Sequence, residues 1–144
     1  MERTIQTFEV SLKAAIFRAE RLLLVQEADT GFWELPGGRI DVGEEQSSHA
    51  EILAREIREE LGPQFRIVTR DETVSWVRQR STDGVYQFLI ARIATYVSGV
   101  PALSDEHQAL RWTGPEDWAG LEFPALSDYT AGLQRLWAIG SALG

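Results

Sequence analysis

Alternating and continuous apolar segments predict a chain built mainly from strands. Apolar and β-branched residues gather in short segments that are separated by polar turn residues. The strands predicted from this pattern cover about residues 7–17, 21–28, 32–35, 65–78, 85–97 and 109–113. Turns are predicted at 18–20 and at 81–84, where the sequence STDG favours a hairpin.

One segment carries strong helix signals over His49–Leu61. Ser48 and Glu51 have the spacing of a capping box, a serine followed three residues later by a glutamate. Gly62 and Pro63 then end the helix. The apolar residues that recur at helical spacing within it are Ala50, Leu53, Ala54, Ile57 and Leu61.

A second helix is predicted at the C-terminal end, from Pro124 to about Ile139, with one apolar stripe. The residues of that stripe are Leu126, Tyr129, Leu133, Leu136 and Trp137. Strands, a helix, more strands and a final helix predict an α/β (α+β) fold, a mixed β-sheet sandwiched between helices. The 144 residues are expected to form a single domain, residues 1–144.

Composition limits the chemistry that the chain can carry. It has no cysteine and two histidines, His49 and His107, which are too few for a zinc site built from thiolates or histidines. A metal ion would therefore be held by carboxylates, and oxygen ligands favour Mg²⁺ or Mn²⁺.

Charge and hydropathy exclude two classes of partner. The formal net charge of −8 argues against a nucleic-acid partner, because such binding needs a cationic surface. No apolar segment approaches the length that spans a bilayer, so no membrane partner is expected, and the N-terminal residues lack the apolar stretch of a signal peptide. A cytoplasmic location is expected.

Three glutamates of the first predicted helix share one of its faces. With Glu56 placed at the origin, Glu60 lies about 40° and Glu59 about −60° around the helix axis, beside the apolar sector. Crowded carboxylates repel one another unless a cation neutralises them, and Mg²⁺ is usually held by a few carboxylates. Arg55, four residues before Glu59, is placed to orient it.

The stretch GGRIDVGEEQSSHAEILAREIREELG resembles the signature of the Nudix hydrolase family (MutT-like domain). That pattern is G, five residues, E, seven residues, then R-E-U-x-E-E-x-G-U, where U is a bulky aliphatic residue. Gly38 and Glu44 match its first part. The second part is matched by Arg55, Glu56, Ile57, Glu59, Glu60 and Gly62.

The chain departs from the pattern at two places. Ten residues separate Glu44 from Arg55 where seven are expected, and Pro63 stands in place of an aliphatic residue. Because Ser48 keeps the usual capping position, the three extra residues are assigned to a loop at Glu45–Ser47. The first glutamate position is then filled by Glu44, by Glu45 or by neither.

The resemblance implies a metal site and a set of catalytic residues. The carbonyl of Gly38 would bind Mg²⁺ (or Mn²⁺) together with Glu56, Glu59 and Glu60. A glutamate, Glu56, Glu59 or Glu106, would be the general base, and Arg55 would support the site. The family pattern leaves that choice open.

Two further groups of residues are candidates outside the signature. Glu106 lies on a predicted loop with five residues between it and Trp112, a place where several Nudix hydrolases carry a functional glutamate, and is expected to bind a metal ion. The string EHQALRW, residues 106–112, also resembles a loop of diadenosine tetraphosphate hydrolases. The neighbouring His107 is expected to form a loop hydrogen bond rather than to bind a metal ion. Candidate contacts to substrate phosphates are Arg39, Arg78 and Arg80.

The resemblance predicts a metal-dependent hydrolase that cleaves the diphosphate linkage of a nucleotide, in a monomer or a homodimer. Nucleoside triphosphates and dinucleoside polyphosphates both fit as substrates. An alternative is a non-catalytic nucleotide-sensing domain on the same fold, although such domains usually lose the glutamates that this chain retains. An isoprenoid diphosphate isomerase on this fold would usually need a cysteine, which is absent.

Overall fold

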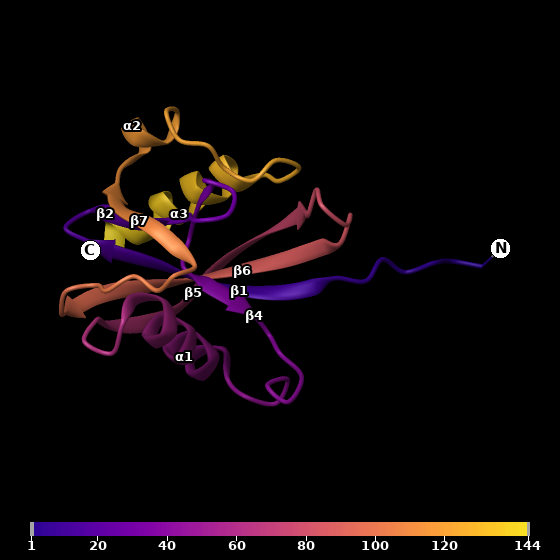
Figure 1. The fold of residues 1–144 in the computed structure, drawn as a ribbon, viewed down its shortest axis with the longest axis horizontal. Coiled ribbons are helices and arrows are strands. Elements are labelled where there is room, and N and C mark those ends of the chain that lie inside the picture. Colours follow the sequence, from indigo (N-terminus) through magenta and orange to yellow (C-terminus); the bar gives the residue numbers. More distant parts are fainter. Residues whose placement is uncertain (1, 144) are drawn as a thin grey trace.

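A computed structural model describes residues 2–143 as one mixed sheet with helices on both sides (Figure 1). The strands are β1 (Glu9–Arg18), β2 (Arg21–Glu27), β3 (Trp33–Glu34), β4 (Gly37–Arg39), β5 (Arg66–Gln79), β6 (Tyr86–Ser98) and β7 (His107–Thr113). The helices are α1 (His49–Leu61), α2 (Pro115–Trp118) and α3 (Tyr129–Leu143). The predicted mixed sheet between helices is confirmed.

Strand β1 is the centre of the sheet. It runs parallel to β6 and antiparallel to β2 and β4, so that Lys13 pairs with Ala91 of β6 and with Gly37 of β4. Strand β2 continues the sheet to β3 and β7, and β5 pairs with β6 at the other side. The short strands β3 and β4 therefore carry the Trp33–Arg39 segment across the middle of the sheet.

The alternation of side chains along β1 separates two hydrophobic cores. Leu12, Ala14 and Ile16 pack against α1, while Ala15 and Phe17 belong to the core beneath α3. Figure 1 shows α1 on one side of the sheet and α2 and α3 on the other. Because both faces are covered, β1 reads as a nearly continuous apolar strand, in which the buried Lys13 is an exception.

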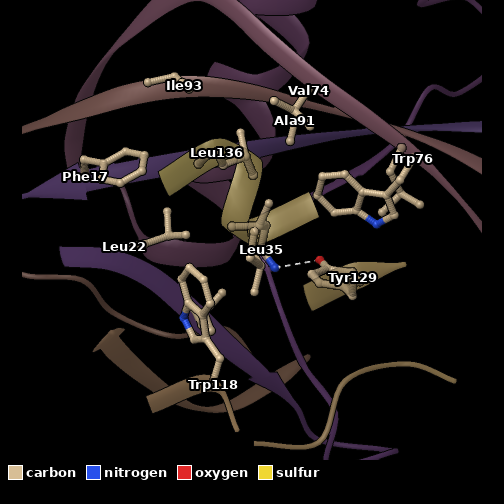
Figure 2. Packing of buried hydrophobic residues seen from close by; sticks show 14 residues of the cluster. Phe17, Leu22, Leu35, Val74, Trp76, Ala91, Ile93, Trp118, Tyr129 and Leu136 are labelled. Atoms are coloured by element: carbon tan, nitrogen blue, oxygen red, sulfur yellow. Dashed lines mark hydrogen bonds between the residues drawn. The ribbon is translucent and has the colours of Figure 1, made fainter. Parts of the chain in front are cut away.

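The core beneath α3 is built from large aromatic side chains (Figure 2). The Trp76 and Tyr129 rings meet edge to face with centroids 5.1 Å apart. The Tyr129 hydroxyl accepts a hydrogen bond from the backbone N–H of Leu35 at 2.8 Å, which ties the segment before the glycine pair to α3. This core thus anchors one end of the segment that shapes the site.

Helix α1 has the bounds that the sequence predicts. The Ser48 hydroxyl accepts the backbone N–H of Glu51 at 3.1 Å, and the helix ends at Gly62, whose φ is +87°. The predicted apolar set was wrong at one position, because Ile52 is buried while Ala54 is exposed.

Helix α3 begins five residues later than predicted and extends to Leu143. The backbone N–H of Gln79 donates to Leu126 O, and Ser127 forms a bridge with Arg78, so this segment follows the edge of β5 instead of starting a helix. Leu126, predicted on the apolar stripe, has a φ of +57° and is exposed. Pairing with the edge of β5 therefore takes the place of the first predicted helical turn.

Two elements are additional to the prediction, and one is longer. Gly37–Arg39, to which no element was assigned, pairs with β1 as β4, and the short α2 places Trp118 in the core. Strand β7 begins at His107 instead of Ala109. Among residues 2–143, no helix has the length and apolar character needed to cross a membrane.

Candidate active site

A cleft of about 360 Å³ opens where β4, the C-terminal half of α1 and the start of β7 meet. The described residues that line it include six that the sequence predicts as site residues: Gly38, Glu60, Glu106, Arg39, Arg78 and Arg80. Neither Glu56 nor Glu59 is among the described residues that line it. Most of the predicted site residues therefore converge on one place, although they come from distant parts of the chain.

The glycine pair of β4 allows the backbone to pass between β1 and α1. A Cβ at Gly37 would lie 2.1 Å from Leu12 O, and Gly37 has a φ of +145°. A Cβ at Gly38 would lie 2.5 Å from the Glu56 carboxylate carbon. Only glycine fits at position 37, because backbone atoms of β1 fill the space. At position 38 a Cβ would have to displace the Glu56 carboxylate, so the glycine leaves its backbone against that carboxylate.

Glu60 is the buried carboxylate of the site. Only 4% of the residue is exposed, and its Oε2 accepts the backbone N–H of Gly37 at 2.8 Å. Burial raises the pKa of Glu60 to about 7, although Lys13 and His107 oppose this effect. At neutral pH burial therefore destabilises the ionised form of Glu60, and a bound cation would offset this destabilisation.

Glu56 and Glu59 differ in environment although they lie one turn apart on α1. Burial raises the pKa of Glu56, an effect that the neighbouring Arg55 partly offsets. The Glu59 side chain is 59% exposed and lies 3.1 Å from the Arg55 guanidinium. The predicted contact between Arg55 and Glu59 is confirmed, but Glu59 turns toward solvent and away from the cleft.

Arg55 also contacts Glu44, and this contact bears on the inserted loop. The Arg55 Nη2 lies 2.7 Å from Glu44 Oε2, and the guanidinium also donates from Nε to the same carboxylate. Glu45 is exposed and accepts the backbone N–H of Gly43. Glu44, rather than Glu45, is thus the glutamate that joins the site, through a bidentate pair with Arg55.

Glu106 reaches the site because its loop is hydrogen-bonded to the end of α1. The backbone N–H of Ala102 donates to Leu61 O at 2.9 Å, and that of Ser104 donates to Glu60 O at 3.2 Å. These bonds place a Glu106 oxygen, a Glu60 oxygen and a ring nitrogen of His107 within 4.8 Å of one another. The predicted proximity of Glu106 to the α1 carboxylates is therefore present.

Three buried charged residues near the cleft were not predicted as part of the site. Glu34 Oε1 lies 3.8 Å from Lys13 Nζ and 3.4 Å from His107 Nε2, and all three residues are buried. Burial opposes ionisation of Glu34, but Lys13 and His107 outweigh it and lower the pKa of Glu34. Burial also opposes charge on His107, yet contacts with Glu34 and Glu60 raise its pKa. Lys13 could have been found from the sequence, since it shares a strand face with the apolar Ala15 and Phe17.

The three candidate arginines line the cleft in different states. Arg39 and Arg80 contact Glu9 Oε1 at 3.4 and 3.3 Å, and Arg80 also pairs with Asp83 at 2.8 Å. The buried Nε of Arg78 has no hydrogen-bond partner within residues 2–143. Of these three arginines, Arg78 is thus the one that forms no ion pair with another described residue.

The donor set of the cleft fits a divalent metal ion. Glu60 and Glu106 offer carboxylate oxygens close together, and the Gly38 backbone, which lacks a covering side chain, lines the same cleft. Mg²⁺ and Mn²⁺ both favour carboxylate and carbonyl oxygens. Glu60 is buried beside His107, and its raised pKa leaves it partly protonated at neutral pH. A divalent ion would compensate the charge of its ionised form.

Comparisons with known proteins agree with the family resemblance of the sequence. Residues 8–131 match the model of the NUDIX domain family. The MutT-like protein of Streptomyces ambofaciens is 31% identical over 109 residues, which are 75% of this chain and 65% of that protein, so this chain spans less than two thirds of its length. The CTP pyrophosphohydrolase of Escherichia coli (strain K12) is 35% identical over 115 residues, covering 77% of this chain and 78% of that protein.

The same fold is found in a solved structure. The solution structure of the E. coli ORF135 protein superposes with a TM-score of 0.72 at 28% identity, covering 92% of this chain and 93% of that one. The signature residues, the topology and the family model, which spans most of the chain, lead to one conclusion. The chain belongs to the Nudix family.

Proposed function

We propose that the protein is a metal-dependent pyrophosphohydrolase that cleaves the diphosphate linkage of a nucleoside triphosphate. The observation that carries the proposal is the convergence of Gly38, Glu60 and Glu106 with three arginines on one cleft. Acidic side chains alone would repel a triphosphate, and arginines alone would leave the carboxylates unneutralised. Both sets together suit an anionic substrate that arrives with a divalent ion.

A bound Mg²⁺ or Mn²⁺ would neutralise the diphosphate and polarise the bond to be broken. The ligands we assign are Glu56, Glu60 and Glu106 with the Gly38 carbonyl. Arg55 holds Glu44, Glu56 and Glu59 in place through its ion pairs. We assign Glu59 a supporting position beside the metal site, since its side chain pairs with Arg55 outside the cleft.

The protein's side chains would bind the phosphates and activate the attacking water. Arg78, with its unpaired Nε, and Arg39 and Arg80, by exchanging carboxylate partners for phosphate oxygens, would hold the chain of phosphates. Glu106 is an exposed carboxylate of the cleft and lies close to Glu60, so we assign to it the proton of the attacking water. Water adds to phosphorus, the anhydride bond breaks, and nucleoside monophosphate and pyrophosphate leave.

A nucleoside triphosphate is favoured over a dinucleoside polyphosphate by the similarity to a protein named CTP pyrophosphohydrolase. The second candidate, a dinucleoside polyphosphate, rests on the resemblance of residues 106–112 to a loop of diadenosine tetraphosphate hydrolases. The placement of Glu106 in the cleft is compatible with both. A non-catalytic sensing domain is disfavoured, because the signature glutamates and Arg55 are all retained, and Arg55 pairs with Glu44, Glu56 and Glu59.

The test is product identification after incubating the purified protein with a panel of nucleotides, including CTP and a dinucleoside tetraphosphate, in Mg²⁺ and in Mn²⁺. We expect CTP to yield CMP and pyrophosphate, with no reaction in excess EDTA. Release of orthophosphate and CDP would contradict the proposed bond cleavage. Absence of turnover for every nucleotide in both metals would favour the sensing domain.

The remaining expectations about partners stay predictions from the sequence. They are a small-molecule nucleotide substrate without nucleic-acid or membrane partners, a cytoplasmic location, and a monomer or homodimer.

A further inference from the structure

His107 is a buried imidazole whose hydrogen-bonding capacity is only partly used. Its side chain is 2% exposed, and Nε2 lies 3.4 Å from Glu34 Oε1. In the part of the chain that the structure describes, Nδ1 is buried without any hydrogen-bond partner. A buried polar atom that lacks a partner is uncommon, and an ion or a water molecule can supply the missing contact.

The same ring lies beside the proposed metal ligands. One ring nitrogen of His107 and one carboxylate oxygen each from Glu60 and Glu106 are all within 4.8 Å of one another. Ligand bonds of about 2.1 Å place opposite ligands of one ion about 4.2 Å apart. At most one pair of three ligands can be opposite, and adjacent ligands of an octahedral ion lie about 3 Å apart, so the three side chains would move closer together when they bind the same ion.

The surroundings of His107 also match those of a histidine ligand. Such histidines almost always use one ring nitrogen for the ion while the other donates to a carboxylate, which fixes the ring and its tautomer. Glu34 supplies that carboxylate, and Glu34 is in turn held by Lys13 Nζ at 3.8 Å. The chain Lys13–Glu34–His107 thus ends at the acidic residues of the cleft.

We propose that His107 is a nitrogen ligand of the divalent ion bound by Glu60 and Glu106, and that it makes the site favour Mn²⁺ over Mg²⁺. This inference rests on the metal site of the proposed function. Mg²⁺ takes oxygen ligands in a strict octahedral geometry, whereas imidazole is a common ligand of transition-metal ions. This proposal departs from the sequence prediction, which favoured a hydrogen-bonding role for His107 over a role as a ligand; the contact with Glu34 supplies only the hydrogen bond.

Pulsed electron paramagnetic resonance of the Mn²⁺-loaded protein tests the proposal directly, because imidazole nitrogen bound to Mn²⁺ gives a characteristic coupling. The chain has two histidines, so His49→Gln is a matched control. We expect nitrogen coupling in the wild type and in His49→Gln, and its loss in His107→Gln. Titration should show Mn²⁺ affinity falling at least about tenfold in His107→Gln, while Mg²⁺ affinity changes little.

The outcomes separate this inference from the proposed function. Bound Mn²⁺ without imidazole coupling in the wild type, together with hydrolysis of CTP, would overturn the role of His107 and leave the hydrolase intact. Coupling that persists in His107→Gln would also overturn it. If thermal unfolding shows that His107→Gln is misfolded, the wild-type and His49→Gln spectra decide whether His107 binds the ion. His107 is the histidine that these two proteins share, so nitrogen coupling in both must come from it. Failure to bind either ion would remove the metal site itself.

Discussion

The acidic cluster (Glu56, Glu60 and Glu106) and the arginine cluster (Arg39, Arg78 and Arg80) belong to one site but are stabilised in opposite ways. The Glu60 residue is 4% exposed and the Glu56 side chain 12%, and burial raises the pKa of both. The Arg39 side chain is 55% exposed, and Arg80 is paired with Glu9 and Asp83. Burial outweighs the nearby positive charges of Arg55 and Lys13 for the two glutamates, whereas Arg39 and Arg80 have carboxylate partners and the Nε of Arg78 has none among the described residues.

This difference separates the roles of the two clusters. Buried carboxylates near one another destabilise the fold when ionised, so they favour a bound cation strongly. Exposed arginine ion pairs contribute little to stability, so their partners can be exchanged for phosphate at low cost. Substitutions in the acidic cluster should therefore change catalysis more than substitutions in the arginine cluster.

The largest effect is expected for Glu60→Gln and Glu56→Gln. Glutamine keeps the shape and the helix, and at position 60 it can still accept the Gly37 N–H, but it removes the charge of a metal ligand. We expect kcat to fall roughly a thousandfold, about 4 kcal/mol of transition-state stabilisation, with an unchanged unfolding temperature. Steady-state kinetics of both variants within about threefold of wild type would refute the acidic cluster as the metal site.

A smaller effect is expected for Glu106→Gln. Glu106 is exposed and reaches the cleft from a loop, so its loss should lower kcat roughly 10- to 1000-fold, about 1.4–4 kcal/mol, with little change in KM. The matched control is Asp105→Asn, an exposed neighbour that is not among the described cleft residues. An equal loss in both variants would indicate a disturbed loop, and an unchanged kcat in Glu106→Gln would remove it from catalysis.

Within the arginine cluster, Arg78 should matter more than Arg80. Arg78 has an unpaired Nε, whereas Arg80 must leave Asp83 before it can bind phosphate. We expect Arg78→Gln to raise KM about tenfold, about 1.4 kcal/mol, and Arg80→Gln to raise it less. Arg58→Gln, on the exposed side of α1, is the control that should leave KM unchanged. The reverse order of Arg78 and Arg80 would show that the paired arginine is the phosphate ligand.

The smallest effect is expected for deletion of Glu45–Ser47, the segment that lengthens the loop before α1. Loop closure depends weakly on length, so the free energy of unfolding should change by about 1 kcal/mol or less. Glu44 stays in the chain to pair with Arg55, and activity should persist. A folded but inactive deletion variant would show that the inserted loop contacts the substrate or supplies a ligand.

Local signals explain which parts could be predicted from the sequence. The bounds of α1 depend on Ser48 and Gly62, which act within one turn of the helix ends, and the prediction of both was confirmed. The start of α3 was wrong because Leu126 bonds to the edge of β5, more than forty residues away in the chain. Strand pairing over such a separation leaves no pattern in the segment itself.

In the site, too, local spacing could be predicted from the sequence, whereas features that depend on distant contacts could not. The helical spacing predicts that Glu56, Glu59 and Glu60 share a face, but their different burial depends on how β4 and the Ala102–Glu106 loop pack against α1. Glu60 borders the apolar sector of the helix, which is the one local signal of its burial. The Lys13–Glu34–His107 contacts join three strands and were not predicted, since each residue alone resembles an ordinary polar position.

The central claim is that a bound cation compensates the charge of the buried Glu60 carboxylate. The most direct test is to measure how the free energy of unfolding depends on pH and on the metal ion. Glu60 has a pKa of about 7 in the folded protein against an ordinary 4.5, so the folded state binds its proton more tightly. In EDTA, the free energy of unfolding should therefore fall by up to roughly 3 kcal/mol as pH rises from 4.5 to above 7.

The measurement is denaturant unfolding of wild type and Glu60→Gln across this pH range, with EDTA and with Mg²⁺. We predict that Mg²⁺ restores most of the lost stability of the wild type near pH 8, while Glu60→Gln shows a smaller pH-dependent fall and little response to the ion. Identical pH profiles and identical stabilisation by Mg²⁺ in the two proteins would contradict the account.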